Sequence, residues 1–557
     1  MSRPQRPGGK VVVECLLNQG VTAAFGVPGE SYLAVLDALH DTGNRLRLVI
    51  TRHEGGAAFM AEAWGKLTGT PGICFVTRGP GATNASIGVH TAMQNSTPMI
   101  LFVGQVGRRM RGREAFQEID YKAFFGDIAK WVVEIDDADR IPEIISRAFA
   151  TALSGRPGPV VIALPEDMLR EMTDVEACQP SPVPRPAAEP AQIDLALAAL
   201  SEAEQPVILV GGGGWGEPAR QHLAQFAARN NLPVATVFRC QDLMDNAQDA
   251  YIGDAGVGMA PYLKEYLRAA DLIFAINIRF GESATDGWRL FDVPKMKATL
   301  IHSHVSPAEI GKIYQPDIAI CASPDQLLAQ IASRPAIGDW SDWCDKGRKG
   351  FLSMRENASQ VGAVDMVEIC AWLDSHLDDD AIITNGAGNF AIWPSKFITY
   401  TGKRRLLAPQ SGAMGAGVPA AVAARLAAPG RQVVCFAGDG DFQMTLAELG
   451  TAAQEGLQPI ILLLNNGMYG TIRAHQERNY PGRESGTRIR NPDFAALARA
   501  YGFFAAKVEH TEDFAPAFTE ALTHPGGALI EIVIDPEDIS PFARLSDIRS
   551  AALRNGN

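Results

Sequence analysis

Two short polar segments in the last third of the chain combine residue types that bind a divalent cation. The segment 438–441 (GDGD) follows the apolar run 433–437, and Asn466 comes shortly after the apolar run 459–464. Between them is room for one helix and a return strand, so both are expected at the carboxyl edge of one parallel sheet, where ligands bind. A carboxylate from Asp439 and an amide oxygen, together with phosphate oxygens, suit Mg²⁺ or Ca²⁺. Two unrelated turns are the alternative, but the spacing of the pair favours a metal site.

A single acidic residue, Glu54, is the second candidate for chemistry. It follows the β-rich run 46–50 and opens a helix expected over 54–67. A first-turn Glu commonly complements the helix dipole; a functional Glu here would be a buried acid that meets a basic ring nitrogen. Glycine-rich turns at 77–84 (TRGPGATN) and 410–417 (QSGAMGAG) also precede helices, although each is weak by itself.

The glycine run 211–216 (GGGGWG) follows the apolar run 207–210 and satisfies a dinucleotide-binding pattern. The acidic residue expected to end the next strand is missing, because the run 234–237 leads to Phe238-Arg239-Cys240. A structural Rossmann-like turn is therefore favoured, and nucleotide binding is the minority interpretation.

The elements that must position these residues alternate between β-rich runs and helical patterns, which is typical of parallel sheets covered by helices. Continuous apolar runs such as 160–164 fit strands buried on both faces. The fold class is therefore predicted to be α/β. The segment 177–192, with five Pro, is predicted to be a linker, and a weaker boundary is expected around 335–360, where Pro and Gly break a polar stretch.

Composition narrows the possible functions. The chain has 557 residues and a formal net charge of −13. An acidic chain without a basic block is a poor candidate for binding nucleic acid or an anionic membrane. No apolar run approaches the roughly 20 residues of a membrane span, no signal peptide is apparent at the start, and the eight Cys form no Cys-x-x-Cys pair. These features predict a cytoplasmic protein.

With Glu54 near one end and GDG…NN near the other, the sequence resembles the thiamine-diphosphate (ThDP) enzymes of the acetolactate synthase type over nearly its whole length. The most telling stretches are FGVPGE (25–30), RHEGGAAFMAEAWGKLTG (52–69), VTRGPGATN (76–84), SGRPGPVVIALPEDM (154–168) and GAMGAGVPAA (412–421). The resemblance implies three doubly wound parallel-sheet domains: a pyrimidine-binding domain (1–176), a central Rossmann-like domain (193–340) and a diphosphate-binding domain (355–557).

The resemblance also implies roles for individual residues. Glu54 corresponds to the acid at N1′ of the aminopyrimidine, Met414 to the apolar wedge that bends the cofactor, and the Gly412 carbonyl to the acceptor of the 4′-amino group. The implied Mg²⁺ ligands are Asp439, Asn466 and the backbone carbonyl of Met468. The other positions expected to contact the cofactor are Gly29, Pro80, Asn84, Ala387, Gly388, Asn389, Gly440, Asp441, Tyr469 and Gly470.

Substrate positions are partly matched. Phe116, Gln117 and Lys130 correspond to residues of the substrate channel. His475, interpreted as a loop residue, stands where the family carries a Trp, and Ser283 where it carries an Arg that holds the acceptor carboxylate. The segment 302–306 (HSHVS) replaces the flavin-contacting stretch, so no FAD is expected; an ADP-like nucleotide in the central domain is a possibility.

The resemblance thus implies a ThDP- and Mg²⁺-dependent lyase or carboligase that acts on a 2-oxo acid or a 2-hydroxy ketone through an enamine. The first alternative is a true acetolactate synthase that condenses two pyruvates. Remote alternatives are an NAD-dependent oxidoreductase and a non-catalytic ThDP-binding regulator. A homodimer or homotetramer with the active site at the subunit interface is expected, with no nucleic acid or membrane partner.

Overall fold

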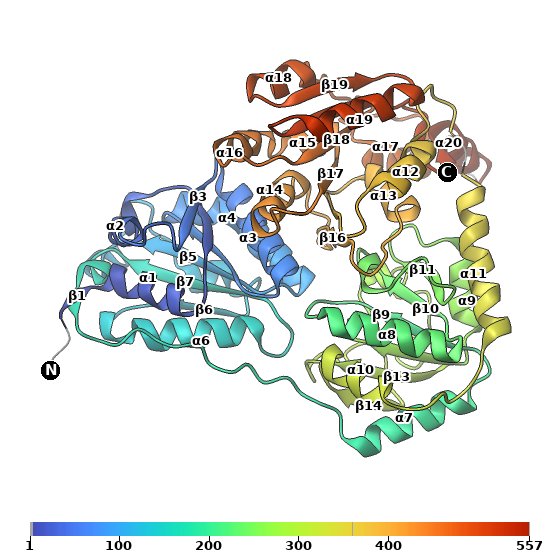
Figure 1. The fold of residues 1–557 in the computed structure, drawn as a ribbon, viewed down its shortest axis with the longest axis horizontal. Helices are drawn as coiled ribbons and strands as arrows, with labels where there is room; N and C mark the ends of the chain where they lie inside the picture. The colour runs from blue at the N-terminus through green and yellow to red at the C-terminus, as the bar shows by residue number, and fades with distance from the viewer. Residues whose placement is uncertain (1–3, 359, 556–557) are drawn as a thin grey trace.

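The computed structural model describes residues 4–358 and 360–555, and three six-stranded parallel sheets organise them (Figure 1). The first sheet has the order β3-β2-β4-β5-β7-β6. Its strands are β2 (Ala23–Gly26), β3 (Arg47–Ile50), β4 (Gly72–Val76), β5 (Met99–Gln105), β6 (Trp131–Glu134) and β7 (Pro159–Pro165). Its helices are α1 (Gly8–Asn18), α2 (Leu33–His40), α3 (Glu54–Thr68), α4 (Gly79–Asn95), α5 (Tyr121–Phe125) and α6 (Ile141–Leu153).

The central sheet has the order β11-β10-β9-β12-β13-β14. Its strands are β9 (Pro206–Val210), β10 (Val234–Val237), β11 (Tyr251–Ala255), β12 (Leu272–Ile276), β13 (Thr299–His304) and β14 (Ile318–Cys321). The accompanying helices are α7 (Pro190–Glu202), α8 (Glu217–Asn230), α9 (Pro261–Ala269), α10 (Pro324–Ala332) and α11 (Ser341–Glu356).

The third sheet has the order β16-β15-β17-β18-β20-β19. Its strands are β15 (Ile382–Asn385), β16 (Arg405–Leu407), β17 (Val433–Gly438), β18 (Ile460–Asn465), β19 (Phe504–Val508) and β20 (Ala528–Val533). Its helices are α12 (Met366–His376), α13 (Ile392–Phe397), α14 (Gly417–Ala427), α15 (Asp439–Gln443), α16 (Leu449–Gln454), α17 (Gly470–Asn479), α18 (Phe494–Ala500), α19 (Phe514–Thr523) and α20 (Leu545–Arg554). The predicted α/β class is confirmed.

Each sheet reverses its strand order at one point. In the third sheet the chain passes from β15 to β16 on one side and continues through β17 and β18 on the other. The loops that follow β15 and β17 therefore diverge at the carboxyl edge, which is where ligands bind in open α/β sheets. The first sheet reverses in the same way between β2 and β4, and the central sheet between β9 and β12.

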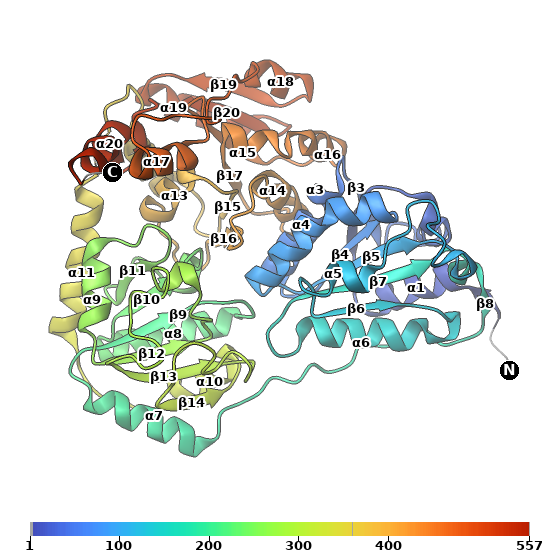
Figure 2. The ribbon, with the colours of Figure 1, turned by 180° about the vertical axis from the view of Figure 1, so that it is seen from behind.

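The first and third sheets share one apolar core. Helix α3 of the first sheet packs against α14 of the third (Figures 1 and 2), and small residues line the contact. Ala57, Ala61, Ala420 and Ala424 are fully or almost fully buried there. Small side chains allow the helices to approach closely, so this contact fixes the two sheets relative to each other.

Two sequence expectations about connections need correction. The expected linker runs to residue 192, but α7 already begins at Pro190, because proline is well tolerated in the first turn of a helix. The expected break around 335–360 contains the 16-residue helix α11. Gly347 and Gly350 do not end this helix; a Cβ at Gly350 would lie 2.4 Å from the ring of Tyr262, so they bring the helix close to its neighbours.

Within residues 4–358 and 360–555, no helix is both long and apolar enough to cross a membrane. The cytoplasmic location stays a prediction.

Candidate functional site

The carboxyl end of β17 presents Asp439, a residue that is only 3% exposed. Its Oδ1 accepts the backbone N–H of Gly440 at 2.9 Å. Its Oδ2 accepts two hydrogen bonds, from the backbone N–H of Gly467 at 2.9 Å and from the side-chain amide of Asn491 at 2.7 Å. Burial raises the pKa of the Asp439 carboxyl, against the opposing effect of these donors. Among the described residues no Lys or Arg forms an ion pair with it.

The turn after β18 closes over the same point. Asn466 Oδ1 accepts the backbone N–H of Met468 at 3.2 Å, and the N–H of Gly467 between them binds Asp439. The structure therefore brings together Asp439, Asn466 and Met468, the three expected metal ligands. Within the described residues no cluster of three or more His, Cys, Asp or Glu could hold a metal ion. A donor set of one carboxylate, one amide and one carbonyl fits Mg²⁺ that is shared with ligand phosphates rather than caged by protein alone.

A helix N-terminus faces the neighbouring loop. Asn389, in the loop after β15, donates its N–H to Thr471 Oγ1 at 2.9 Å, in the first turn of α17. A Cβ on Gly470, the first residue of α17, would lie 2.8 Å from Asn389 Oδ1. The loop of Ala387, Gly388 and Asn389 and the start of α17 thus lie side by side, and a helix N-terminus attracts phosphate.

Asp441 is directed into the protein. It is buried, and its Oδ1 accepts the backbone N–H of Ala387 at 2.9 Å and of Gly415 at 2.8 Å. Burial raises the pKa of Asp441 to about 7. This carboxyl therefore joins the loop after β15 to the segment that carries Gly412 and Met414.

The first and central domains both hold the segment 408–411 of the third domain, which precedes Gly412. Lys66 of α3 donates to the Ala408 carbonyl at 2.9 Å, and Arg239 of the central domain donates to the Pro409 carbonyl at 2.6 Å. Asn95 Oδ1, at the end of α4, accepts the N–H of Gln410 at 2.6 Å. Gly412 itself is exposed and Met414 half-buried, so both are available to a ligand.

Glu54 lies in the first domain and is half-buried. Its Oε2 accepts the side-chain amide of Asn84 at 2.9 Å. Among the described residues no hydrogen bond or ion pair joins Glu54 to Asp439 or Asn466. Glu54 and Asp439 thus belong to different domains of the chain, the N-terminal and the C-terminal one, and Glu54 is less buried than the sequence led us to expect.

Other expected residues gather around the reversal point of the first sheet. The Gln117 carbonyl accepts the N–H of Gly79, next to Pro80, at 2.9 Å, and Phe116 is 72% exposed. Gly29 lies against the loop after β4, where a Cβ would come within 2.5 Å of the Thr77 Cβ. A larger side chain in place of Gly29 would not fit without movement.

Lys130 has a different environment. It precedes β6, and its ammonium donates to the carbonyls of Thr151 and, at 2.7 Å, Ser154 at the end of α6. Burial lowers the pKa of Lys130 to about 8. Among the described residues no hydrogen bond connects it with Gln117, and its role in a substrate channel stays a prediction.

His475 does not lie in a loop, as the sequence suggested, but on helix α17, where it is exposed beside Arg478. The sequence after the Asn-Asn turn lacks a strong apolar period, which is why the helix was missed. The helix is held instead by Glu477, which is fully buried and pairs with Arg473 and with Arg549 of α20; Figure 2 shows α17 and α20 side by side.

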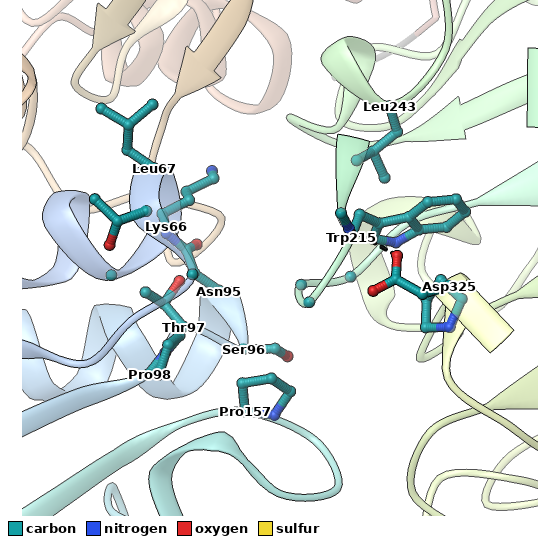
Figure 3. Close-up of a pocket in the computed structure, with 18 of the residues that line it drawn as sticks. Lys66, Leu67, Asn95, Ser96, Thr97, Pro98, Pro157, Trp215, Leu243 and Asp325 are labelled. Carbon is teal, nitrogen blue, oxygen red and sulfur yellow. Dashed lines mark hydrogen bonds between the residues drawn. The ribbon is translucent and has the colours of Figure 1, made fainter. Parts of the chain in front are cut away.

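The glycine run 211–216 borders a cavity of about 880 Å³ between the domains. Figure 3 shows Lys66 and Asn95 of the first domain on one side and Trp215 and Asp325 of the central domain on the other. A Cβ at Gly213 would lie 2.2 Å from the Ser96 carbonyl, so this glycine lets the two domains approach. The run therefore has a structural use, as favoured from the sequence.

Comparison with known proteins identifies the family. Residues 6–124 match the description "Thiamine pyrophosphate enzyme, N-terminal TPP binding domain", residues 193–331 the central domain and residues 386–532 the C-terminal TPP binding domain. The chain belongs to the thiamine pyrophosphate enzymes. As a member of this family it is a ThDP-dependent enzyme, and the predicted resemblance is confirmed.

Curated relatives of this ThDP enzyme extend over nearly its full length. It is 33% identical to the acetolactate synthase large subunit of Corynebacterium glutamicum, over 93% of this chain and 85% of the relative. It is 32% identical to the acetolactate synthase isozyme 3 large subunit of Escherichia coli, over 92% of each chain. A probable acetolactate synthase large subunit of Methanocaldococcus jannaschii is 32% identical, over 97% of this chain and 95% of the relative. The enzyme is thus similar to carboligases.

Sequence reasoning missed two residues of this ThDP enzyme that hold the candidate site. Glu448 accepts the backbone N–H groups of Arg52 and His53, at 3.2 and 3.0 Å, just before Glu54. Asn491 contacts Asp439. Neither lies in a motif; Asn491 precedes a Pro and reads as a turn residue.

Proposed function

We propose that the protein is a ThDP- and Mg²⁺-dependent lyase or carboligase that takes a 2-oxo acid or a 2-hydroxy ketone as donor. The observation that carries this proposal is the convergence of Asp439, Asn466 and Met468 beside the N-terminus of α17. A buried carboxylate that has no cationic partner within residues 4–358 and 360–555, together with a helix N-terminus, suits a Mg²⁺-diphosphate group.

When bound, ThDP supplies a carbon nucleophile that adds to the donor carbonyl, while the protein supplies orientation and electrostatics. Glu54 would hold a proton at N1′ of the aminopyrimidine. The Gly412 carbonyl would accept a hydrogen bond from the 4′-amino group, and Met414 would pack against the cofactor.

The proposed assembly rests on the placement of Glu54 and Asp439 in different domains. Both must reach one small cofactor, yet a single chain leaves Glu54 half-buried. Apolar side chains are exposed on both sides of the site: Phe116 is 72% exposed, Met444 53% and Ile472 54%. We propose a homodimer or homotetramer with the site between subunits. A strictly monomeric but fully active species in light scattering would contradict it.

For the reaction, donor cleavage is favoured over acetolactate formation. Ser283 replaces the Arg expected to hold an acceptor carboxylate, and losing a charge-assisted hydrogen bond of about 1.5–3 kcal/mol weakens binding of a second 2-oxo acid by roughly 10–150-fold. A screen of 2-oxo acids and 2-hydroxy ketones with ThDP and Mg²⁺, followed by analysis of CO₂ and coupled products, tests this. Efficient conversion of pyruvate to acetolactate would favour the acetolactate synthase alternative, which the curated relatives support.

A nucleotide is the second ligand we propose, in the cavity bordered by residues 211–216. Arg220 lines it, is buried, and has an Nε without a partner among the described residues. Basic side chains outnumber acidic ones in the lining of this cavity. The basic residues are Lys66, Arg185, Arg220, Arg239, Lys403, Arg405 and Arg431. This suits the phosphates of an ADP-like nucleotide.

Thermal shift with ADP, adenosine and FAD tests the nucleotide. ADP should raise the melting temperature more than adenosine, and Arg220→Ala should reduce the shift. A yellow purified protein with a flavin absorbance band would contradict the expected absence of FAD.

A further inference from the structure

A segment downstream of α17 pairs with the turn that is expected to bind the metal. Ile489 donates its N–H to the Gly467 carbonyl at 2.9 Å, and Tyr469 donates its N–H to the Thr487 carbonyl at 2.8 Å. Met468 and Arg488 form an antiparallel bridge between these bonds. Residues 487–489 therefore run antiparallel to residues 467–469. This pairing places Asn491 at the ends of β17 and β18.

The Asn491 side chain connects both strand ends with one amide. Its Nδ2 donates to Asp439 Oδ2 at 2.7 Å, after β17, and to Asn465 Oδ1 at 2.8 Å, at the end of β18. Its Oδ1 accepts the side-chain amide of Gln443 at 3.0 Å, from α15. Every polar atom of this amide is thus used, which fixes its orientation.

These bonds decide how the Asp439 carboxylate points. An ionised carboxylate offers about four acceptor positions. N–H groups of Gly440, Gly467 and Asn491 occupy three positions of Asp439. About one position is left for a cation, and the two donors on Oδ2 hold the carboxylate so that the remaining position has a fixed direction.

We propose that Asn491 is a positioning residue for the metal site: it orients the Asp439 carboxylate and keeps the ends of β17 and β18 at the separation that Mg²⁺ requires. The inference rests on the proposed function and deepens it. Groups that orient a metal ligand typically contribute about 10–100-fold to metal affinity, since Mg²⁺ demands near-ideal geometry.

The test uses Asn491→Ala and, as a matched control, Asn479→Ala, which truncates an exposed Asn at the end of α17. Titration calorimetry with Mg²⁺ at saturating ThDP should give a dissociation constant about 10–100-fold higher for Asn491→Ala and unchanged for Asn479→Ala. High Mg²⁺ should restore most of the ThDP bound. Asn491→Ser keeps one donor on a shorter side chain, so its dissociation constant for Mg²⁺ should lie between those of wild type and Asn491→Ala. If Asn491→Ala does not fold, Asn491→Ser takes its place in the test.

The melting temperatures of the metal-free variants distinguish a role of Asn491 in positioning the metal ligand from a role in stability alone. A lowered melting temperature with unchanged Mg²⁺ affinity in the Asn491 variants would overturn the inference, because the amide would then only stabilise the fold. If wild-type protein bound no ThDP with Mg²⁺, the proposed function itself would fail, and this inference with it. Unchanged affinity beside a functional wild-type site would refute the role of Asn491 alone.

Discussion

Glu448 Oε1 lies 3.0 Å from the backbone nitrogen of His53, the residue directly before Glu54. A carboxylate of the third domain therefore fixes the start of α3 in the first domain, although 395 positions separate the two residues. Burial raises the pKa of Glu448, and its bonds to Arg52, His53 and Thr451 oppose that shift. Contacts from two domains thus hold the backbone that carries Glu54.

Replacing the acid tests its role directly. Glu54→Gln keeps the shape and the amide contact with Asn84, so the fold and ThDP binding should be largely retained. Turnover should fall by roughly 10²–10⁴-fold, the range for losing a positioned acid–base group. Steady-state kinetics at saturating ThDP and Mg²⁺ measure this. Full activity in the variant would rule out the assignment.

Removing the expected metal ligand Asp439 should prevent the protein from retaining ThDP. Asp439→Ala should abolish retention of ThDP, because no cationic side chain among the described residues pairs with this position and the diphosphate then lacks its bridging ion. EDTA should have the same effect on wild type and be reversed by Mg²⁺. Calorimetry provides the measurement, and an unchanged ThDP affinity would show that the metal site has been misplaced.

Glu477 links stability to pH. Its bond to Arg549, aided by the Gly482 N–H and Arg473, lowers the pKa of Glu477 to about 2, from an ordinary value of 4.5. Because the folded-state pKa is depressed, the stabilisation is complete above pH 4.5 and is lost as pH falls toward 2.

Glu477→Gln should lower stability at pH 7 by about 3–5 kcal/mol, the cost of breaking a buried ion pair, and should flatten the pH dependence between 4.5 and 2. Thermal unfolding of both proteins across this range checks it. Parallel pH profiles would show that other groups carry the acid sensitivity.

Gly213 is predicted to set the contact between the first two domains. Because a Cβ there would lie 2.2 Å from the Ser96 carbonyl, Gly213→Ala should destabilise the protein by about 1–3 kcal/mol, as overpacking does. Gly281→Ala, where a Cβ meets nothing within 4 Å, is the control. Equal melting temperatures for the two variants would contradict the close approach.

The sequence by itself determined the strands and the order of the functional segments. The runs 72–76 and 234–237 form β4 and β10 with the expected bounds, because a strand buried on both faces must be continuously apolar. Placing Asp439 and Asn466 at neighbouring strand ends needed only the rule that parallel strands end at the same edge.

Contacts between distant segments were decided by the tertiary structure alone. Asn491 meets Asp439, and Glu448 meets His53, through backbone and side-chain hydrogen bonds that leave no periodic trace in the sequence. Helix α11 was missed because its glycines suggested a break, whereas they serve close packing against Tyr262. Hydrophobic periodicity reports which face of an element is buried; which residue lies opposite depends on how the three sheets pack together.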